Sequence, residues 1–245
     1  MKVRLDQLLL QRGLVASRSQ AESYIRLGKV QVAGKAIAKP GYFVDPAAKL
    51  ELLQDEQYVS RAGLKLASVA KLLDLDFRGK IVLDVGSSTG GFTDYALRRG
   101  ATKVIAVDVG TDQLHPSLRG NPQIELHEKT DIRDVSPTGS IRLTETPDII
   151  VIDVSFISLR DILPHIAKYL SGRETQIVAM VKPQFETGTR LKNAGVIKNN
   201  TDRRRILQDF ELWSREYFVI RAKADSEVAG THGNRERFYV LTATS

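Results

Sequence analysis

The sequence predicts an α/β fold in which a doubly wound, Rossmann-like parallel sheet follows a small α+β domain. Three observations predict it. After residue 60, short apolar runs alternate with amphipathic stretches, which is typical of a parallel sheet with helices on both faces. The first apolar run leads into a glycine-rich turn, and the first 40 residues carry a separate basic pattern. We expect a basic domain over 1–53, a linker over 54–60 and the sheet domain over 61–245.

The amino-acid composition excludes several classes of protein. Hydrophobic residues make up 42% of the 245, which is enough for a packed core. Cysteine is absent, which excludes a disulfide framework and a cysteine nucleophile, and we assign no metal site. The longest apolar runs have five residues, as at 177–181, and are too short to span a bilayer. The start of the chain leads into no apolar core, so we expect no signal peptide and a cytoplasmic protein.

Positive charge is concentrated at the beginning of the chain. The first 40 residues hold eight Lys and Arg against two acidic residues, whereas 61–245 hold 27 against 23. The net charge of +7, placed in this way, favours a polyanionic partner such as a nucleic acid.

The basic segment predicts two short helices and then a small sheet. Leu5, Leu8 and Leu9 share one helical face, and Ser17-Arg18-Ser19-Gln20 is a capping box that opens a second helix. Ala33-Gly34, between alternating apolar residues, is typical of a hairpin. Further short strands are expected at 42–44 and 50–52.

This order of elements resembles the alpha-L RNA-binding domain. The matching residues are Arg4-Leu5-Asp6, Ser17-Arg18-Ser19-Gln20-Ala21, Ile25 and Gly28-Lys29-Val30-Gln31-Val32. The resemblance implies a face that contacts RNA phosphates, formed by Arg4, Arg18, Arg26, Lys29 and Lys35. The alternative is an ordinary solvated basic face.

Apolar periodicity predicts the elements of the second domain. An amphipathic helix is expected over 62–73. Strands are expected at 81–85, 103–108, 124–127, 148–152 and 176–181, and helices at 91–99, 159–170 and 201–216, the last with Thr201 as its N-cap. Two more strands, at 217–224 and 236–243, complete the pattern, and a hairpin makes one of them antiparallel.

The stretch Ile81–Phe92 predicts a strand, a tight turn and a helix N-terminus, where free N–H groups can meet a ligand. Its glycines, Gly86, Gly90 and Gly91, give G-x-x-x-G-G, which is neither the dinucleotide fingerprint nor a P-loop. With Asp84 before the turn, this pattern suits S-adenosylmethionine (SAM), which has an amino-acid end and no phosphates. The alternative is any strand-to-helix turn of an α/β domain.

Charged residues follow the predicted strands at their carboxyl ends, where ligands of doubly wound sheets bind. Asp84, Asp108, Asp153 and Lys182 lie at four such ends. Asp108 is placed to accept hydrogen bonds from ribose hydroxyls, and Asp131, after the third strand, lies where adenine is expected.

Together these motifs resemble the TlyA family of rRNA 2'-O-ribose methyltransferases, often called haemolysin A, within the FtsJ-like methyltransferases. The matching residues are Ser60-Arg61-Ala62-Gly63-Leu64-Lys65-Leu66, Asp84–Asp94, Asp153-Val154-Ser155-Phe156-Ile157-Ser158 and Val181-Lys182-Pro183-Gln184-Phe185-Glu186. The resemblance implies a Lys-Asp-Lys-Glu tetrad on Lys65, Asp153, Lys182 and Glu236. It also implies SAM binding by Asp84, Gly86, Ser88, Gly90, Gly91, Phe92, Asp108 and Asp131.

A ribose hydroxyl must lose its proton to attack a methyl group, which requires an aligned general base. We expect Lys182 to be that base, with Lys65 as a neighbouring cation that favours its neutral form. Asp153 and Glu236 then orient the two lysines. Glu227 competes with Glu236 for this role, and His232 is interpreted as a loop residue.

Two features of other methyltransferases are absent from this sequence, and their absence favours an oxygen atom as the acceptor of the methyl group. Base-carbon methylation commonly uses a cysteine, and amine methylation commonly uses an Asn/Asp-Pro-Pro-Tyr/Phe motif where this chain has Asp153-Val154-Ser155-Phe156. The basic segment 187–205 follows the expected base, and its Arg190 and Lys192 are expected to contact RNA. For the arginines at 203–205, a solvated helix start is an equal alternative.

The leading hypothesis is SAM-dependent 2'-O-methylation of a ribose, on a cytidine as in the similar family, in ribosomal RNA of a subunit or its precursor. A non-catalytic RNA-binding assembly factor is the second hypothesis, and the tetrad argues against it. A membrane-lytic protein is the third, and the absence of a spanning segment argues against it.

Overall fold

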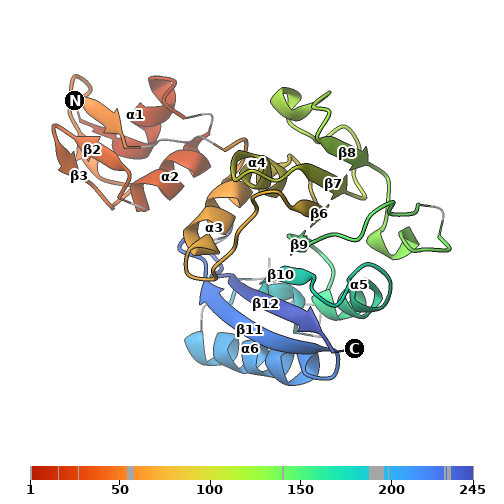
Figure 1. Cartoon of the computed structure of the whole chain (residues 1–245). Coiled ribbons are helices and arrows are strands. Elements are labelled where there is room, and N and C mark those ends of the chain that lie inside the picture. Colours follow the sequence, from red (N-terminus) through yellow and green to blue (C-terminus); the bar gives the residue numbers. More distant parts are fainter. Residues whose placement is uncertain are drawn as a thin grey trace.

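The computed structural model describes residues 2–15, 17–26, 28–53, 58–139, 141–187, 196–197, 199–228, 230 and 233–244. The chain forms a small α+β part, drawn in red and orange in Figure 1, and a larger α/β part built on one seven-stranded sheet. Of the expected linker, 54–57 lie outside the described residues.

The small part has two helices and two small sheets. Its elements are β1 (Val3–Arg4), α1 (Leu5–Gln11), α2 (Arg18–Arg26), β2 (Val30–Val32), β3 (Lys35–Ala36), β4 (Phe43–Val44) and β5 (Leu50–Leu52). Strand β1 pairs with β4, and β2 lies between β3 and β5, all antiparallel. Ser17 Oγ accepts a hydrogen bond from the Gln20 N–H at 3.1 Å, as a cap of α2 requires. Ala33 and Gly34 both have positive φ, which confirms the tight hairpin.

The large part begins with helix α3 (Arg61–Ala70) and then alternates strands with helices. Its strands are β6 (Ile81–Val85), β7 (Lys103–Val107), β8 (Ile124–His127), β9 (Ile149–Ile152), β10 (Gln176–Val181), β11 (Phe218–Asp225) and β12 (Arg237–Ala243). Their order in the sheet is β11-β12-β10-β9-β6-β7-β8. The five strands from β10 to β8 are parallel, and β12 is antiparallel to both of its neighbours, as the expected hairpin requires.

Helices cover both faces of this sheet. Helices α3 and α4 (Gly91–Arg98) pack on one face, and α5 (Leu163–Tyr169) and α6 (Asn200–Ser214) pack on the other. Alternate residues of the central strands enter the two cores: Val82 faces α3 and α4, whereas Leu83 faces the opposite layer. Because both faces of the sheet are buried, the sequences of its strands are continuous apolar runs.

Two expected helices differ from their predictions. The helix predicted over 159–170 is a 3₁₀ turn, η3 (Leu159–Asp161), followed by α5, which starts only at Leu163 with a proline in its first turn. Helix α6 is capped by Asn199, whose side chain accepts a hydrogen bond from the Thr201 N–H at 2.8 Å, so the predicted cap at Thr201 is wrong. Among the described residues, no helix is both long and apolar enough to cross a membrane.

Candidate active site

Three neighbouring strands, β9, β10 and β12, bring three members of the predicted tetrad to one edge of the sheet, and helix α3 brings the fourth. Asp153 directly follows β9 and Lys182 directly follows β10, its parallel neighbour. Glu236 directly precedes β12, which runs antiparallel to β10 with Val181 opposite Arg237. Lys182 and Glu236 therefore lie opposite one another just beyond the last ladder pair.

Lys182 is held by two acceptors from the loop that follows β9. Its Nζ lies 2.6 Å from Asp153 Oδ1 and donates a hydrogen bond to Ser155 Oγ at 2.7 Å. Lys182 is only 8% exposed, so these contacts fix the direction of its amine. Ser155 was not predicted as a site residue, although it stands two positions after Asp153 in the quoted motif.

The second lysine forms its own pair across the domain. Lys65 Nζ, on helix α3, lies 2.6 Å from Glu236 Oε2, and the two residues are 9% and 2% exposed. Glu227, the competing carboxylate, is exposed. The structure therefore places Glu236, and not Glu227, against Lys65.

Close packing of two helices sets the position of Lys65. A Cβ on Gly63 would lie 2.9 Å from the Gly91 carbonyl oxygen and 2.6 Å from Tyr58 Cβ, so only glycine lets α3 approach α4 this closely. Lys65 lies two residues further along α3, on the segment that this contact holds against the start of α4.

Asp84, in β6, is fully buried beside this edge. Its Oδ2 accepts a hydrogen bond from Thr93 Oγ1 at 2.6 Å, and burial raises its pKa to about 7. Its Oδ1 and the hydroxyl of Ser87 are buried without a hydrogen-bond partner among the described residues. Buried polar atoms of this kind require a partner, and the ammonium and hydroxyl groups of SAM are donors that fit them.

The glycine-rich turn at 86–91, called the glycine turn below, lies next to Asp84. Gly86 has φ +79°, and a Cβ there would lie 2.9 Å from the Asp153 carbonyl oxygen and 3.1 Å from the Val154 side chain, so only glycine lets the turn pack this closely on the loop after β9. Gly90, with φ +85°, caps helix α4. Asp108 accepts hydrogen bonds from the N–H groups of Ser88, at 2.8 Å, and Gly110, at 2.6 Å, which hold its carboxylate beside the turn.

Two of the residues expected to bind SAM are engaged in contacts of their own. The ring of Phe92 is buried in the core, 6.0 Å from the ring of Phe238, so only its backbone can face a ligand at the turn. Asp131 caps a 3₁₀ turn and is bound by Arg133 through two hydrogen bonds from its guanidinium, which lowers the pKa of the Asp131 carboxyl.

An aromatic pair lies on the two loops that carry Asp153 and Lys182. Phe156 is 93% exposed and adopts φ +68°, a left-handed conformation that is unusual for a bulky residue. Its ring centroid lies 5.5 Å from that of Phe185. Both residues lie in motifs that carry the resemblance, but neither was predicted to have a role. Their position just after two strand-end charges was the available signal.

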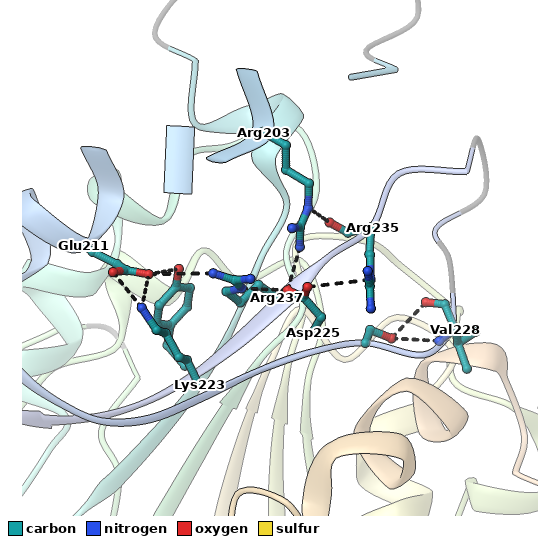
Figure 2. A network of polar contacts seen from close by, with 9 residues as sticks. Arg203, Glu211, Lys223, Asp225, Val228, Arg235 and Arg237 are labelled. Carbon is teal, nitrogen blue, oxygen red and sulfur yellow. Dashed lines mark hydrogen bonds and ion pairs between the residues drawn. The ribbon is translucent and has the colours of Figure 1, made fainter. Parts of the chain in front are cut away.

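A polar network supports the strand that follows Glu236 (Figure 2). Asp225, in β11, lies 2.6 Å from both Arg203 of α6 and Arg237 of β12, and 3.6 Å from Arg235. The backbone of Ser226 also donates to the Glu236 carbonyl oxygen at 3.0 Å. These contacts hold the chain in place immediately before and after Glu236.

Two of the five residues of the small domain that are predicted to contact RNA, Arg4 and Arg18, are held together by one carboxylate. Asp6 is fully buried and accepts hydrogen bonds from Arg4, at 2.9 and 3.0 Å, and from Arg18, at 2.8 Å. Because one carboxylate binds both guanidinium groups, the two arginines lie side by side. Arg26, Lys29 and Lys35 are exposed. Arg190, Lys192 and His232 lie outside the described residues.

Comparisons with known proteins identify the family of the chain. The FtsJ-like methyltransferase family model matches residues 58–243, and the S4 domain model matches residues 3–49. The chain is 36% identical to the 16S/23S rRNA (cytidine-2'-O)-methyltransferase TlyA of Mycobacterium tuberculosis, over 98% of this chain and 90% of that protein. It is 40% identical to the 23S rRNA (cytidine-2'-O)-methyltransferase TlyA of Campylobacter jejuni, over 78% and 73%.

Relatives with a haemolysin name are equally similar. The chain is 37% identical to Hemolysin A of Brachyspira hyodysenteriae, over 84% of this chain and 85% of that protein. A solved structure from Streptococcus thermophilus, which carries a provisional hemolysin name, has a TM-score of 0.71 and 36% identity, covering 100% of this chain and 89% of its own.

Proposed function

Because the chain belongs to the FtsJ-like methyltransferase family, whose methyl donor is SAM, we propose that it methylates the 2'-hydroxyl of a cytidine ribose in ribosomal RNA. The observation that carries the proposal is the buried Lys182 amine, aimed by Asp153 and Ser155 at the edge where the glycine turn also lies. The named activities of the relatives from M. tuberculosis and C. jejuni support the nucleoside and the class of RNA.

When bound, SAM supplies a methyl group on a positively charged sulfur. Asp84, the backbone of Gly86 and Gly90, and the carboxylate of Asp108 are the groups that would hold it. Lys182, as the free amine, would take the proton of the 2'-hydroxyl while that oxygen accepts the methyl group that SAM would supply, the sulfur leaving as a neutral thioether. Asp153 and Ser155 keep the amine in line with that hydroxyl, which is the positioning on which such a displacement depends.

The second pair balances charge in the same site. Lys65 places a positive charge close to the reacting groups, and Glu236 compensates it at 2.6 Å. A buried cation without such a partner would be costly, so the two residues act as a unit. The exposed ring of Phe156, on the loop that carries Asp153, presents an aromatic face to the base of the target nucleotide.

The basic domain over 1–53 supplies binding to folded RNA, and the domain over 61–245 supplies transfer. Arg4 and Arg18, joined by Asp6, are suited to phosphate contacts, which fix the position of RNA without reading its sequence. The substrate is an assembled subunit or its precursor, recognised by shape, and the protein acts in the cytoplasm.

Nucleoside mass spectrometry tests the proposal. Ribosomal subunits from cells that lack the protein are incubated with the purified protein and SAM, and the 16S and 23S rRNA are digested separately. New 2'-O-methylcytidine in either RNA is the expected result. A methyl group on a nucleobase, or no transfer to either subunit, would overturn the proposal.

A further inference from the structure

Glu186 joins the two loops that carry Asp153 and Lys182. It stands four residues after Lys182, at the end of the 3₁₀ turn η4 (Pro183–Phe185). Its Oε2 accepts a hydrogen bond from Ser158 Oγ at 2.6 Å, and its Oε1 accepts one from the Leu159 N–H at 2.8 Å. Its side chain is 1% exposed.

The loop 153–158 is thereby held at both ends by the segment after β10. Lys182 binds its beginning through Asp153 and Ser155, and Glu186 binds its end. Between these attachments, Phe156 adopts its left-handed conformation against Phe185. A strained conformation of this kind persists only where the surrounding contacts impose it, so the attachment at Ser158 is part of what fixes the loop.

Burial of this carboxylate is not favourable in itself. Burial raises the pKa of Glu186, which means that the fold disfavours its charged form. Its nearest cation among the described residues, Arg160, lies 3.7 Å away. An apolar side chain at such a position commonly costs less stability than a buried charge. The two hydrogen bonds to the loop therefore point to a role in placing the loop.

We propose that Glu186 is a positioning residue for methyl transfer: by holding Ser158 and Leu159, it keeps Asp153 and Ser155 on the Lys182 amine. The inference rests on the proposed function of Lys182. Among the described residues, no side-chain contact joins Glu186 to the amine or to the glycine-rich turn at 86–91, so the side chain acts through the loop that it holds.

The test compares Glu186→Ala with a control, Glu125→Ala. Glu125 is a half-buried carboxylate on β8, at the opposite edge of the sheet from β11, and it binds Lys103 at 2.8 Å and His127 at 2.7 Å. We expect Glu186→Ala to lower kcat by about 10- to 100-fold, with the Kd for SAM changed less than about threefold. Glu125→Ala should lower Tm and leave kcat unchanged. Glu186→Gln, which keeps an oxygen for the Leu159 N–H, should recover part of kcat.

Hydrogen exchange provides a readout that does not depend on activity. In Glu186→Ala, amides of 153–161 should exchange at least about tenfold faster, whereas those of 84–94 should not change. Unchanged exchange in 153–161, a kcat within about twofold of the wild type, or equal loss of kcat in Glu125→Ala would each overturn the inference. If the wild-type protein transfers no methyl group, the proposed function fails while the exchange result still decides whether Glu186 holds the loop.

A second variant covers the case in which Glu186→Ala does not fold. Ser158→Ala removes only the hydroxyl that donates to Glu186 Oε2. A lower kcat at an unchanged Kd for SAM supports the inference, and wild-type kcat overturns it.

Discussion

Lys65 and Glu236 form an ion pair of 2.6 Å that joins the first helix of the large domain to its last strand. Both side chains are buried, so each depends on the other for its charge to be tolerated. The pair therefore affects stability and transfer in different ways, and the two effects can be separated.

Glu236→Ala should leave the Lys65 ammonium buried without its partner and lower the free energy of unfolding by about 3–5 kcal/mol. The double variant Lys65→Met, Glu236→Leu should recover most of that stability and still fail to transfer methyl groups. Urea unfolding and a methyl-transfer assay measure the two effects. An active double variant would remove this pair from the mechanism.

Lys182→Ala should abolish transfer, because the hydroxyl proton then has no acceptor in line. The expected loss in kcat is about 100-fold or more. The Kd for SAM should stay nearly unchanged, because no contact among the described residues joins Lys182 to the glycine-rich turn at 86–91. Single-turnover transfer and calorimetric SAM titration provide the measurements. Unchanged turnover would show that another group takes the proton.

Gly63→Ala should force α3 away from α4, because the added Cβ would lie 2.6 Å from Tyr58 and 2.9 Å from the Gly91 carbonyl oxygen. Overpacking of this kind costs about 1–3 kcal/mol, and the displaced Lys65 should lower kcat as well. Gly41→Ala is the control, because its Cβ would meet only the Arg4 guanidinium at 3.7 Å. The Tm and kcat of both variants test the prediction. Equal Tm and equal kcat for Gly63→Ala and Gly41→Ala would contradict it.

Asp84 should make stability depend on pH. Burial raises its folded pKa to about 7, above its ordinary value of about 4, so the folded state binds a proton that the unfolded state has already lost. The stabilisation is complete below about pH 4 and is lost as pH rises to about 7. Relative to Asp84→Asn, the wild-type free energy of unfolding should fall by roughly a few kcal/mol over that range. Parallel unfolding curves at pH 5, 6, 7 and 8 test this, and identical pH profiles would refute it.

Asp6→Ala should weaken RNA binding although Asp6 itself is buried, because Arg4 and Arg18 lose the carboxylate that holds them together. We expect the Kd for rRNA to rise about tenfold, and Arg18→Ala to reduce the slope of log affinity against log salt by about 1. Asp45→Ala, which removes an exposed negative charge from the same domain, is the control for charge alone. Filter binding at several salt concentrations distinguishes these cases, and an Asp6→Ala affinity equal to that of the control would contradict the prediction.

The strands could be predicted from sequence because helices bury both of their faces. Strand β6 at 81–85, for example, is one apolar run that ends in a glycine turn, and it lies where the run predicts it. Helix α5 could not be placed as well, because apolar spacing continues through the 3₁₀ turn at 159–161 and conceals the break before Leu163.

The pairing of the charged residues depended on long-range register, which local patterns do not contain. Sequence reasoning left Glu236 and Glu227 as competitors because both lie near the last strands. The register of β12 against β10, with Val181 opposite Arg237, places Glu236 beside Lys182 and against Lys65. Glu186 stands in one of the matching motifs, but its role could not be predicted, because its two partners come from a loop of another strand.

Strand β12 lies between β10 and β11 although it follows both in the chain. During synthesis, β11 therefore has no sheet neighbour until β12 has been made and inserted. The same insertion delivers Glu236 to Lys65, so a nascent chain can fold its glycine turn early while its pair of buried charges is completed only in the final folding step.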